Sequence, residues 1–295
     1  MTIAILGGSG RIGAPLAREL ADRGVDARLL VRDPGRGDLP LPAVRGDLRD
    51  RASLATALTG CRGLFLLTPH GPEQEAHERA AVDAALAAGV ERIVKVSGCA
   101  ASLSPNGPTA AAAGHWRTER LIERSGVPFA FLRPAFLLQN LLDTVAPIVA
   151  RTGALIGPFA DEPIAMVDAR DVAACAAALL VAPTPGDDAH ALTGPAPVTH
   201  RQIAAALDAR LLRLPLPLVA RALRRRGGSA WEREHQLRMA RFYASGAEGG
   251  TTAAVRALTG RPPRDLAGFL AEHADAFTGT SARHAPAPAL QETPS

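Results

Sequence analysis

The amino-acid sequence predicts an α/β protein built on a doubly wound parallel sheet, with a small, mostly helical C-terminal lobe. Short apolar segments alternate with segments of helical periodicity through about the first 180 residues. Strands separated by helices form parallel sheets with right-handed crossovers. The chain has 295 residues, of which 47% are hydrophobic. That is enough for one large α/β unit with an added lobe, or for two small domains.

Each predicted strand is a short apolar run. The first ends in glycines, and the fourth lacks polar–apolar alternation, which predicts burial on both of its faces. The first six strands are Thr2–Leu6, Ala27–Val31, Ala43–Arg45, Gly63–Leu67, Arg92–Ser97 and Phe129–Arg133, and a later one is Pro163–Val167.

The predicted helices follow the apolar spacing of 3 and 4 residues, as with Ile12, Leu16 and Leu20. Gly89 and Gly126 are expected to end two of them. The helices lie at Arg11–Asp22, Leu54–Leu58, Pro72–Ala88, His115–Ser125, Leu137–Arg151, Val172–Val181 with Asp168 as N-cap, and about 199–210, 215–226, 230–245 and 262–277.

This pattern divides the chain into a sheet-forming core, a lobe and a tail. The core spans 1–135 and is completed by about 163–193. The substrate lobe spans 136–162 and 194–278, and the tail 279–295 is predicted to be disordered from its Thr, Ser, Ala, Pro and His content.

Composition excludes several classes of protein. The three cysteines Cys61, Cys99 and Cys175 are odd in number and widely spaced, which argues against disulfides or a metal site and favours the cytoplasm. The net charge of +4 is scattered, so nucleic acid is not expected as a partner. No apolar run is long enough for a membrane span.

A glycine-rich turn between the first strand and the first helix indicates a dinucleotide site. Gly7-Gly8-Ser9-Gly10-Arg11-Ile12-Gly13 fits both G-x-G-x-x-G and G-x-x-G-x-x-G. A turn without side chains lets the backbone approach a pyrophosphate, and the helix N-terminus adds free N–H groups. Because the turn follows a strand and opens an amphipathic helix, it predicts a Rossmann-type domain. The contacts expected here come from Gly7, Ser9, Gly10, Arg11, Ile12 and Gly13.

The end of the second strand distinguishes NADP(H) from NAD(H). An acidic residue at this place would hold the ribose 2′-OH of NAD(H). Arg32 stands there, and its guanidinium can bind a 2′-phosphate, with Arg11 as a second clamp. The alternative is that Asp33 binds the ribose while Arg32 is solvated. We expect NADP(H).

Residues after the third and fourth strands add to this site. Asp47, with Leu48, could accept a hydrogen bond from adenine, or Asp47 could cap the next turn. Thr68, Pro69 and His70 follow the fourth strand at the edge where ligands lie in open α/β sheets.

Together these segments resemble the atypical short-chain dehydrogenase/reductases of the NmrA-like group. The most specific segments are the helix with His115 and Glu119, the strand end Arg133-Pro134-Ala135-Phe136, and the later Asn140. The likeness covers about the first 180 residues. It implies NADP(H) binding by a quinone or enone reductase, or by a redox sensor without turnover, and it allows a homodimer. Other matching segments are Gly7–Gly13, Val31–Pro34, Gly46–Leu48, Leu66–Pro69, Val94–Gly98 and Ser125–Pro128.

The usual proton donor of short-chain dehydrogenases, Tyr-x-x-x-Lys, cannot be built. The only tyrosine is Tyr243 and the only lysine is Lys95, and Ala111 stands where the tyrosine belongs if His115 matches the lysine. His115 is then the predicted catalytic or cofactor contact, since imidazole can donate a proton near neutral pH. The alternative is a structural histidine bonded to Glu119 one turn later.

The remaining site residues are predicted around the nicotinamide and the substrate. Ser97 and Pro134 are expected beside the cofactor, and Phe136 beside both. Cys99, Asn140 and Trp231 are expected at the substrate, and each could equally be structural.

The predicted function is NADP(H)-dependent reduction of a small apolar carbonyl, quinone or enone. A quinone or enone needs mainly orientation, because the cofactor carries the chemistry. The arginine- and alanine-rich composition suggests, by analogy, a step in bacterial secondary metabolism. The alternatives are a sensor without turnover and a non-redox isomerase or cyclase on the same fold.

Overall fold

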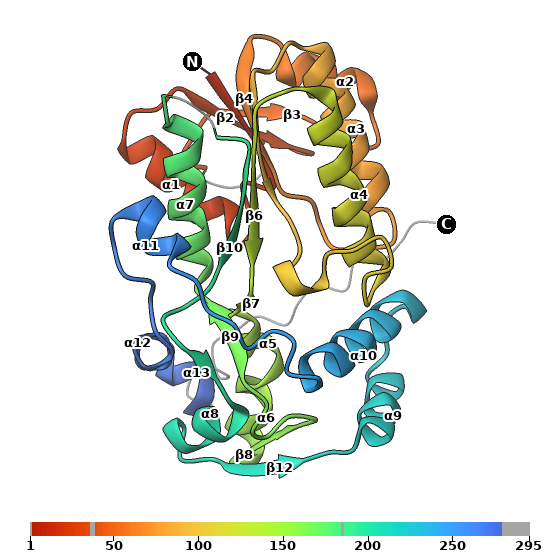
Figure 1. The fold of residues 1–295 in the computed structure, drawn as a ribbon, viewed down its shortest axis with the longest axis vertical. Coiled ribbons are helices and arrows are strands. Elements are labelled where there is room, and N and C mark those ends of the chain that lie inside the picture. Colours follow the sequence, from red (N-terminus) through yellow and green to blue (C-terminus); the bar gives the residue numbers. More distant parts are fainter. Residues whose placement is uncertain (1, 36–38, 184–185, 279–295) are drawn as a thin grey trace.

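A seven-stranded parallel sheet forms the centre of the molecule in the computed structural model, which describes residues 2–35, 39–183 and 186–278 (Figure 1). Its strand order is β10-β6-β5-β4-β1-β2-β3. The strands are β1 (Thr2–Leu6), β2 (Ala27–Val31), β3 (Ala43–Arg45), β4 (Cys61–Leu66), β5 (Arg92–Val96), β6 (Phe129–Pro134) and β10 (Asp188–Leu192). The predicted doubly wound α/β class is confirmed.

Helices cover both faces of this sheet. One face carries α1 (Gly13–Asp22), α7 (Ala169–Val181) and α11 (Ala254–Thr259), and the other carries α2 (Arg51–Leu58), α3 (Gln74–Ala87) and α4 (Ala110–Ser125) (Figure 1). Strand β1 shows why both faces are apolar, because Ile3 and Ile5 join the core under α1 while Ala4 and Leu6 join the core under α2 and α3. The predicted two-sided burial of β4 is likewise found, with Phe65 on one side and Leu64 on the other.

The turn and cap signals in the sequence end several helices as expected. Gly126 follows α4 with φ +74°, and Gly89 follows α3 with φ +74°. Such positive φ values favour glycine because it has no Cβ. Asp168 caps α7 by accepting a hydrogen bond from the Arg170 N–H at 2.8 Å.

A second part of the molecule lies beyond the carboxyl ends of the central strands (Figure 1). A three-stranded sheet joins β7 (Phe136–Leu137), β9 (Ile164–Val167) and β11 (Pro197–Val198), and a two-stranded sheet joins β8 (Ala154–Gly157) and β12 (Arg210–Arg213). Its helices are α5 (Asn140–Thr144), α6 (Ala146–Thr152), α8 (His200–Ala206), α9 (Leu216–Arg226), α10 (Ala230–Ala244), α12 (Leu266–Glu272) and α13 (Ala274–Thr278). A 3-10 turn, Ala100–Ser102, follows β5.

Two predicted helices are wrong as single elements. The segment Leu137–Arg151 divides into the end of β7, α5 and α6, because Pro147 suits the first turn of a new helix and not the interior of an older one. The segment 262–277 divides into α12 and α13. The division into core and substrate lobe stays a prediction, and the tail predicted to be disordered, 279–295, lies outside the described residues.

Candidate dinucleotide site and its polar end

The glycine turn is folded so tightly that two of its positions exclude any side chain. Gly7 has φ +78°, and a Cβ there would lie 2.5 Å from the Leu67 carbonyl oxygen. A Cβ on Gly13 would lie 2.1 Å from the Gly7 carbonyl oxygen. Both distances are far below ordinary contact. The turn is closed by the Gly10 N–H, which donates to the Gly7 carbonyl oxygen at 3.0 Å.

This turn lies where ligands bind in doubly wound sheets. From β1 the chain builds the sheet outward through β2 and β3, then returns to add β4 on the opposite side, so the strand order reverses between β1 and β4. Gly7, after β1, lies so close to Leu67, after β4, that a Cβ on Gly7 would overlap the Leu67 backbone. Within the described residues, the N–H groups of Ser9, Arg11 and Ile12 meet no hydrogen-bond acceptor, and no side chain caps α1. The turn therefore fits a pyrophosphate.

The two arginines predicted near the 2′-phosphate differ in their surroundings. Arg32 is exposed and has no ion-pair or hydrogen-bond partner in the described part of the chain. Arg11 is engaged with α5: its guanidinium pairs with Asp143, lies 3.3 Å from the Asn140 side-chain oxygen and 3.4 Å from the Gln139 carbonyl oxygen. Of these two arginines, only Arg32 has no anionic partner among the described residues. Asn140, predicted at the substrate, is here a partner of Arg11.

Asp47 makes the local contact that was its alternative role. Its carboxylate accepts a hydrogen bond from the Arg49 N–H at 3.0 Å, as in an Asx-turn. That bond and the Arg49 side chain hold the pKa of Asp47 below its usual value. Leu48 packs on the core under α2. An adenine contact from Asp47 stays a prediction.

His115 lies in a buried polar cluster formed with Gln74 and Glu78 on α3 and Lys95 on β5. Lys95 Nζ donates to Glu78 Oε1 at 3.0 Å and lies 2.9 Å from His115 Nδ1, which is 3.1 Å from the same carboxylate oxygen. Gln74 Nε2 lies 2.7 Å from His115 Nε2. Lys95 and Glu78 are fully buried. We call these four residues the His115 cluster.

The charges of this cluster balance one another. Burial acts to raise the pKa of Glu78, but Lys95 and His115 lower it well below its usual range. Burial and the Lys95 ammonium lower the pKa of His115, against the opposing effect of Glu78. These lowered pKa values favour a carboxylate on Glu78 and an uncharged imidazole on His115 near neutral pH. Thr68, predicted beside the cofactor, donates to Glu78 Oε1 at 3.2 Å.

Helix α10 adds aromatic and imidazole rings above this cluster. His70, after β4, has its ring centroid 6.3 Å from that of His115 and 4.4 Å from that of His235, and the two Nε2 atoms of His70 and His235 are 3.1 Å apart. Trp231 stacks on His235 at 5.1 Å and meets the edge of His70 at 5.7 Å. His70 is exposed as a residue, yet burial of its ring and the neighbouring His235 lower its pKa to about 4.

The other predicted residues lie at the ends of β5 and β6. Ser97 is buried, and its hydroxyl has no partner in the residues described. Burial, with Glu248 nearby, raises the pKa of the Cys99 thiol to about 12, so it is not a thiolate at neutral pH. Pro134 ends β6, while Phe136 on β7 meets the Tyr243 ring at 5.5 Å. Pro69 is exposed between Thr68 and His70.

Comparison with known proteins decides the family. Residues 1–211, more than two thirds of the chain, match the NmrA-like family. The chain belongs to the NmrA-like family. The resemblance expected from the glycine turn, the His115 helix and the Arg133 strand end is thereby confirmed.

Two curated relatives match this NmrA-like protein from end to end. A (4-alkanoyl-5-oxo-2,5-dihydrofuran-3-yl)methyl phosphate reductase of Streptomyces griseus is 35% identical, covering 93% of this chain and 99% of its own. An NAD(P)H azoreductase of Xenophilus azovorans is 31% identical, with 93% and 99% covered. Among solved structures, the NADPH complex of an NADPH-dependent quinone oxidoreductase of Escherichia coli is 25% identical, with a TM-score of 0.83 and 92% and 99% covered.

Sequence reasoning missed most of the His115 cluster in this NmrA-like protein. The alternative considered for His115 paired it with Glu119, but Glu119 binds Arg133 through two hydrogen bonds of 3.0 and 2.6 Å. This ion pair links two of the most specific segments of the resemblance, the helix α4 and the end of β6. Lys95 was the available signal, because a lysine between Val94 and Val96 in a buried strand needs an anion nearby.

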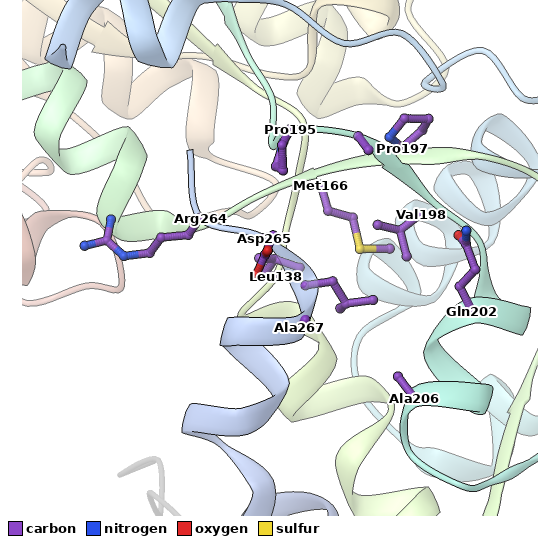
Figure 2. Close-up of a pocket in the computed structure, with 12 residues that line it drawn as sticks. Leu138, Met166, Pro195, Pro197, Val198, Gln202, Ala206, Arg264, Asp265 and Ala267 are labelled. Carbon is purple, nitrogen blue, oxygen red and sulfur yellow. The ribbon is translucent and has the colours of Figure 1, made fainter. Parts of the chain in front are cut away.

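A separate cavity of about 350 Å³ lies in the C-terminal part (Figure 2). Leu138, Met166 and Val198 line it, and Figure 2 shows Gln202 and Asp265 at its side. These polar groups already cap α8 and α12. None of the predicted cofactor or substrate residues lines this cavity, so we do not assign it to the reaction.

Two further observations concern the described residues only. They contain no cluster of His, Cys, Asp or Glu side chains suited to hold a metal ion. None of their helices combines the length and the apolar character needed to cross a membrane.

Proposed function

We propose that this protein is an NADP(H)-dependent oxidoreductase that reduces a small apolar quinone, enone or related carbonyl compound. One observation carries the proposal. The glycine turn, with N–H groups that are free within the described residues, lies at the carboxyl edge of the sheet, as do the imidazole rings of His70 and His115, against which α10 packs. The end-to-end likeness to two reductases supports it, since both relatives are covered over 99% of their length.

The glycine turn and Arg32 hold the cofactor in this proposal. The N–H groups of Ser9, Arg11 and Ile12 bind the pyrophosphate, and the exposed guanidinium of Arg32 binds the 2′-phosphate. Arg11 acts indirectly, because its pairing with Asp143 fixes α5 against the turn. When bound, NADPH supplies the reducing equivalent.

The polar end of the site suits an acceptor that needs orientation more than acid catalysis. Tyr243 lies on α10 and Lys95 on β5, so neither contributes a Tyr-x-x-x-Lys pair to α4, where Ala111 stands. A plain ketone would need that acid. A quinone or enone can take its proton from solvent while Trp231, His70 and Phe136 orient it. The name of the Streptomyces griseus relative describes an unsaturated lactone, which is a conjugated acceptor.

The first test is consumption of NADPH across a panel of quinones, enones and saturated ketones. We expect turnover with quinones or enones and little or none with the ketones. NADP(H) binding without consumption by any acceptor would refute the reductase and favour a sensor or a non-redox enzyme. Production of a reduced enone in a bacterial secondary pathway remains the biological setting we propose.

The second test is the cofactor preference of Arg32→Ala. Loss of a charge-assisted phosphate contact costs about 1.5–3 kcal/mol, so the Kd for NADPH should rise roughly 10- to 100-fold while that for NADH changes little. Arg79→Ala is the matched control, because Arg79 is an exposed arginine of α3. If wild type binds NADH more tightly than NADPH, the assignment of NADP(H) is wrong.

A further inference from the structure

Lys95 has three hydrogen-bond acceptors for its three ammonium protons. Its Nζ lies 3.0 Å from Glu78 Oε1, 2.9 Å from the Val96 carbonyl oxygen and 2.9 Å from His115 Nδ1. An ammonium group can only donate, so the 2.9 Å contact assigns the His115 Nδ1 lone pair as its acceptor. The same nitrogen lies 3.1 Å from Glu78 Oε1, which already accepts a hydrogen bond from Lys95, so the Lys95 contact and a proton on Nδ1 exclude each other. The side chain of Lys95 has no exposed surface, so water cannot replace any of these acceptors.

This arrangement leaves the His115 ring with a single proton, at Nε2. In the structure the Gln74 amide nitrogen lies 2.7 Å from this Nε2 and 3.0 Å from Nδ1, so a proton on Nε2 requires the amide to turn. The carbonyl oxygen of Gln74 is buried and has no donor in the described residues. Half a turn of the amide brings this oxygen to the Nε2–H, and an incoming ligand oxygen can take the same place.

The other charged and titratable groups around His115 do not change this assignment. Glu119, on the same helix, is neutralised by Arg133. His70 faces the ring from the loop after β4, and His235 lies behind His70 on α10; the pKa of each is lowered, first by burial. Among the residues that the structure describes, the one carboxylate within hydrogen-bond distance of His115 is that of Glu78, and Lys95 binds the same Oε1 atom.

We infer that Lys95 and Glu78 are positioning residues that hold His115 uncharged, with its proton on Nε2, as a hydrogen-bond donor toward the substrate or the nicotinamide ribose. The inference rests on the proposed function for the identity of that acceptor. In the usual short-chain arrangement a lysine and its tyrosine partner lie on one helix. Here the buried cation comes from β5 beneath the helix and acts through His115. A neutral imidazole donates without bringing a net charge to the site.

Imidazole nitrogen NMR of histidine-labelled protein tests the inference without any turnover. The His115 signals are assigned by their loss in His115→Gln. His273→Gln is the control, because His273 lies at the C-terminal end of α12 and its loss should leave the His115 signals in place. We expect Nε2–H with unprotonated Nδ1, and titration at a lower pH than that of an ordinary histidine. An Nδ1–H ring, or titration near the ordinary histidine pKa, would overturn the inference even if the enzyme reduces quinones.

Lys95→Met gives the directional test. It removes the donor to Nδ1 and leaves the Glu78 carboxylate, so the proton should move to Nδ1 and the His115 pKa should rise into the accessible range. Lys95→Arg keeps the cation and should leave the ring uncharged. If Lys95→Met does not fold, the His115 spectrum is recorded in Glu78→Gln instead. We expect the Nε2–H tautomer to persist in that variant. A His115 spectrum that is the same in wild type and Lys95→Met would refute the positioning role. Failure of the proposed function would show separately, as absent NADPH binding or consumption.

Discussion

Gly13→Ala is the sharpest perturbation of the proposed cofactor site. The new Cβ would lie 2.1 Å from the Gly7 carbonyl oxygen, and 2.7 Å from both the Gly7 carbonyl carbon and the Gly8 Cα. All three are backbone atoms, so no side-chain rotation can relieve the overlap. Ordinary contact begins at 3.4 Å, so α1 and the turn must separate by more than about 1 Å.

The cost divides between stability and binding. Overpacking of this kind destabilises by about 1–3 kcal/mol. A shift of the same size removes the N–H groups of the turn from hydrogen-bond distance of a pyrophosphate. Loss of one or two charge-assisted bonds, about 3 kcal/mol, corresponds to a roughly 100-fold increase in the NADPH Kd.

The assay is NADPH titration calorimetry together with thermal unfolding of the protein without cofactor. Gly157→Ala is the control, because its Cβ would meet no atom within 4 Å. We expect Gly157→Ala to retain wild-type affinity. A Gly13→Ala protein that is folded and binds NADPH within about twofold of wild type would refute the pyrophosphate assignment.

Three further outcomes are expected. His200 is buried against Phe159, and burial lowers its pKa to about 4. Between about pH 4 and about pH 6.5 the unfolded chain therefore binds a proton at this residue that the folded chain does not. The free energy of unfolding should be highest above about pH 6.5 and fall by up to about 3 kcal/mol toward pH 4. Urea midpoints across this range test it. His200→Phe should reduce the slope, and the remaining slope belongs to the other histidines whose pKa is lowered by burial, such as His70 and His235. An unchanged slope would contradict the reasoning. Arg133→Met leaves the fully buried Glu119 carboxylate with only the longer Arg120 contact of 3.9 Å among the described residues, and should cost about 3 kcal/mol by chemical denaturation. Much of this loss should be recovered when Arg133→Met is combined with Glu119→Gln. No recovery would mean that the ion pair is not the cause. Trp231→Ala removes the ring contacts to His235 and His70. It should raise the KM for the acceptor roughly 3- to 10-fold in steady-state assays, while the Kd for NADPH stays the same. A change in the NADPH Kd alone would place Trp231 at the cofactor.

The sequence alone was sufficient for the features that depend on local order. The strands β1, β2 and β3 and the caps at Asp168, Gly89 and Gly126 have the predicted places, because periodicity and turn chemistry act within a few residues. The glycine turn was readable for the same reason. Strand β10 was missed, since its Asp-Ala-His-Ala-Leu sequence carries no strand signal and only pairing with β6 makes it one.

The partners of the functional side chains were decided by tertiary structure. Glu119 is one helical turn from His115, so spacing favoured that pair, yet Arg133 on the neighbouring strand binds it instead. Glu78 and Lys95 are 17 residues apart, on elements that the sheet order alone brings together. The sequence suggested Arg11 as a second contact to the 2′-phosphate, but the structure pairs its guanidinium with Asp143 from α5. Local sequence determines where the chain turns and which face is apolar, whereas a buried charge takes its partner from whichever element the packing places beside it, because burial without one is too costly.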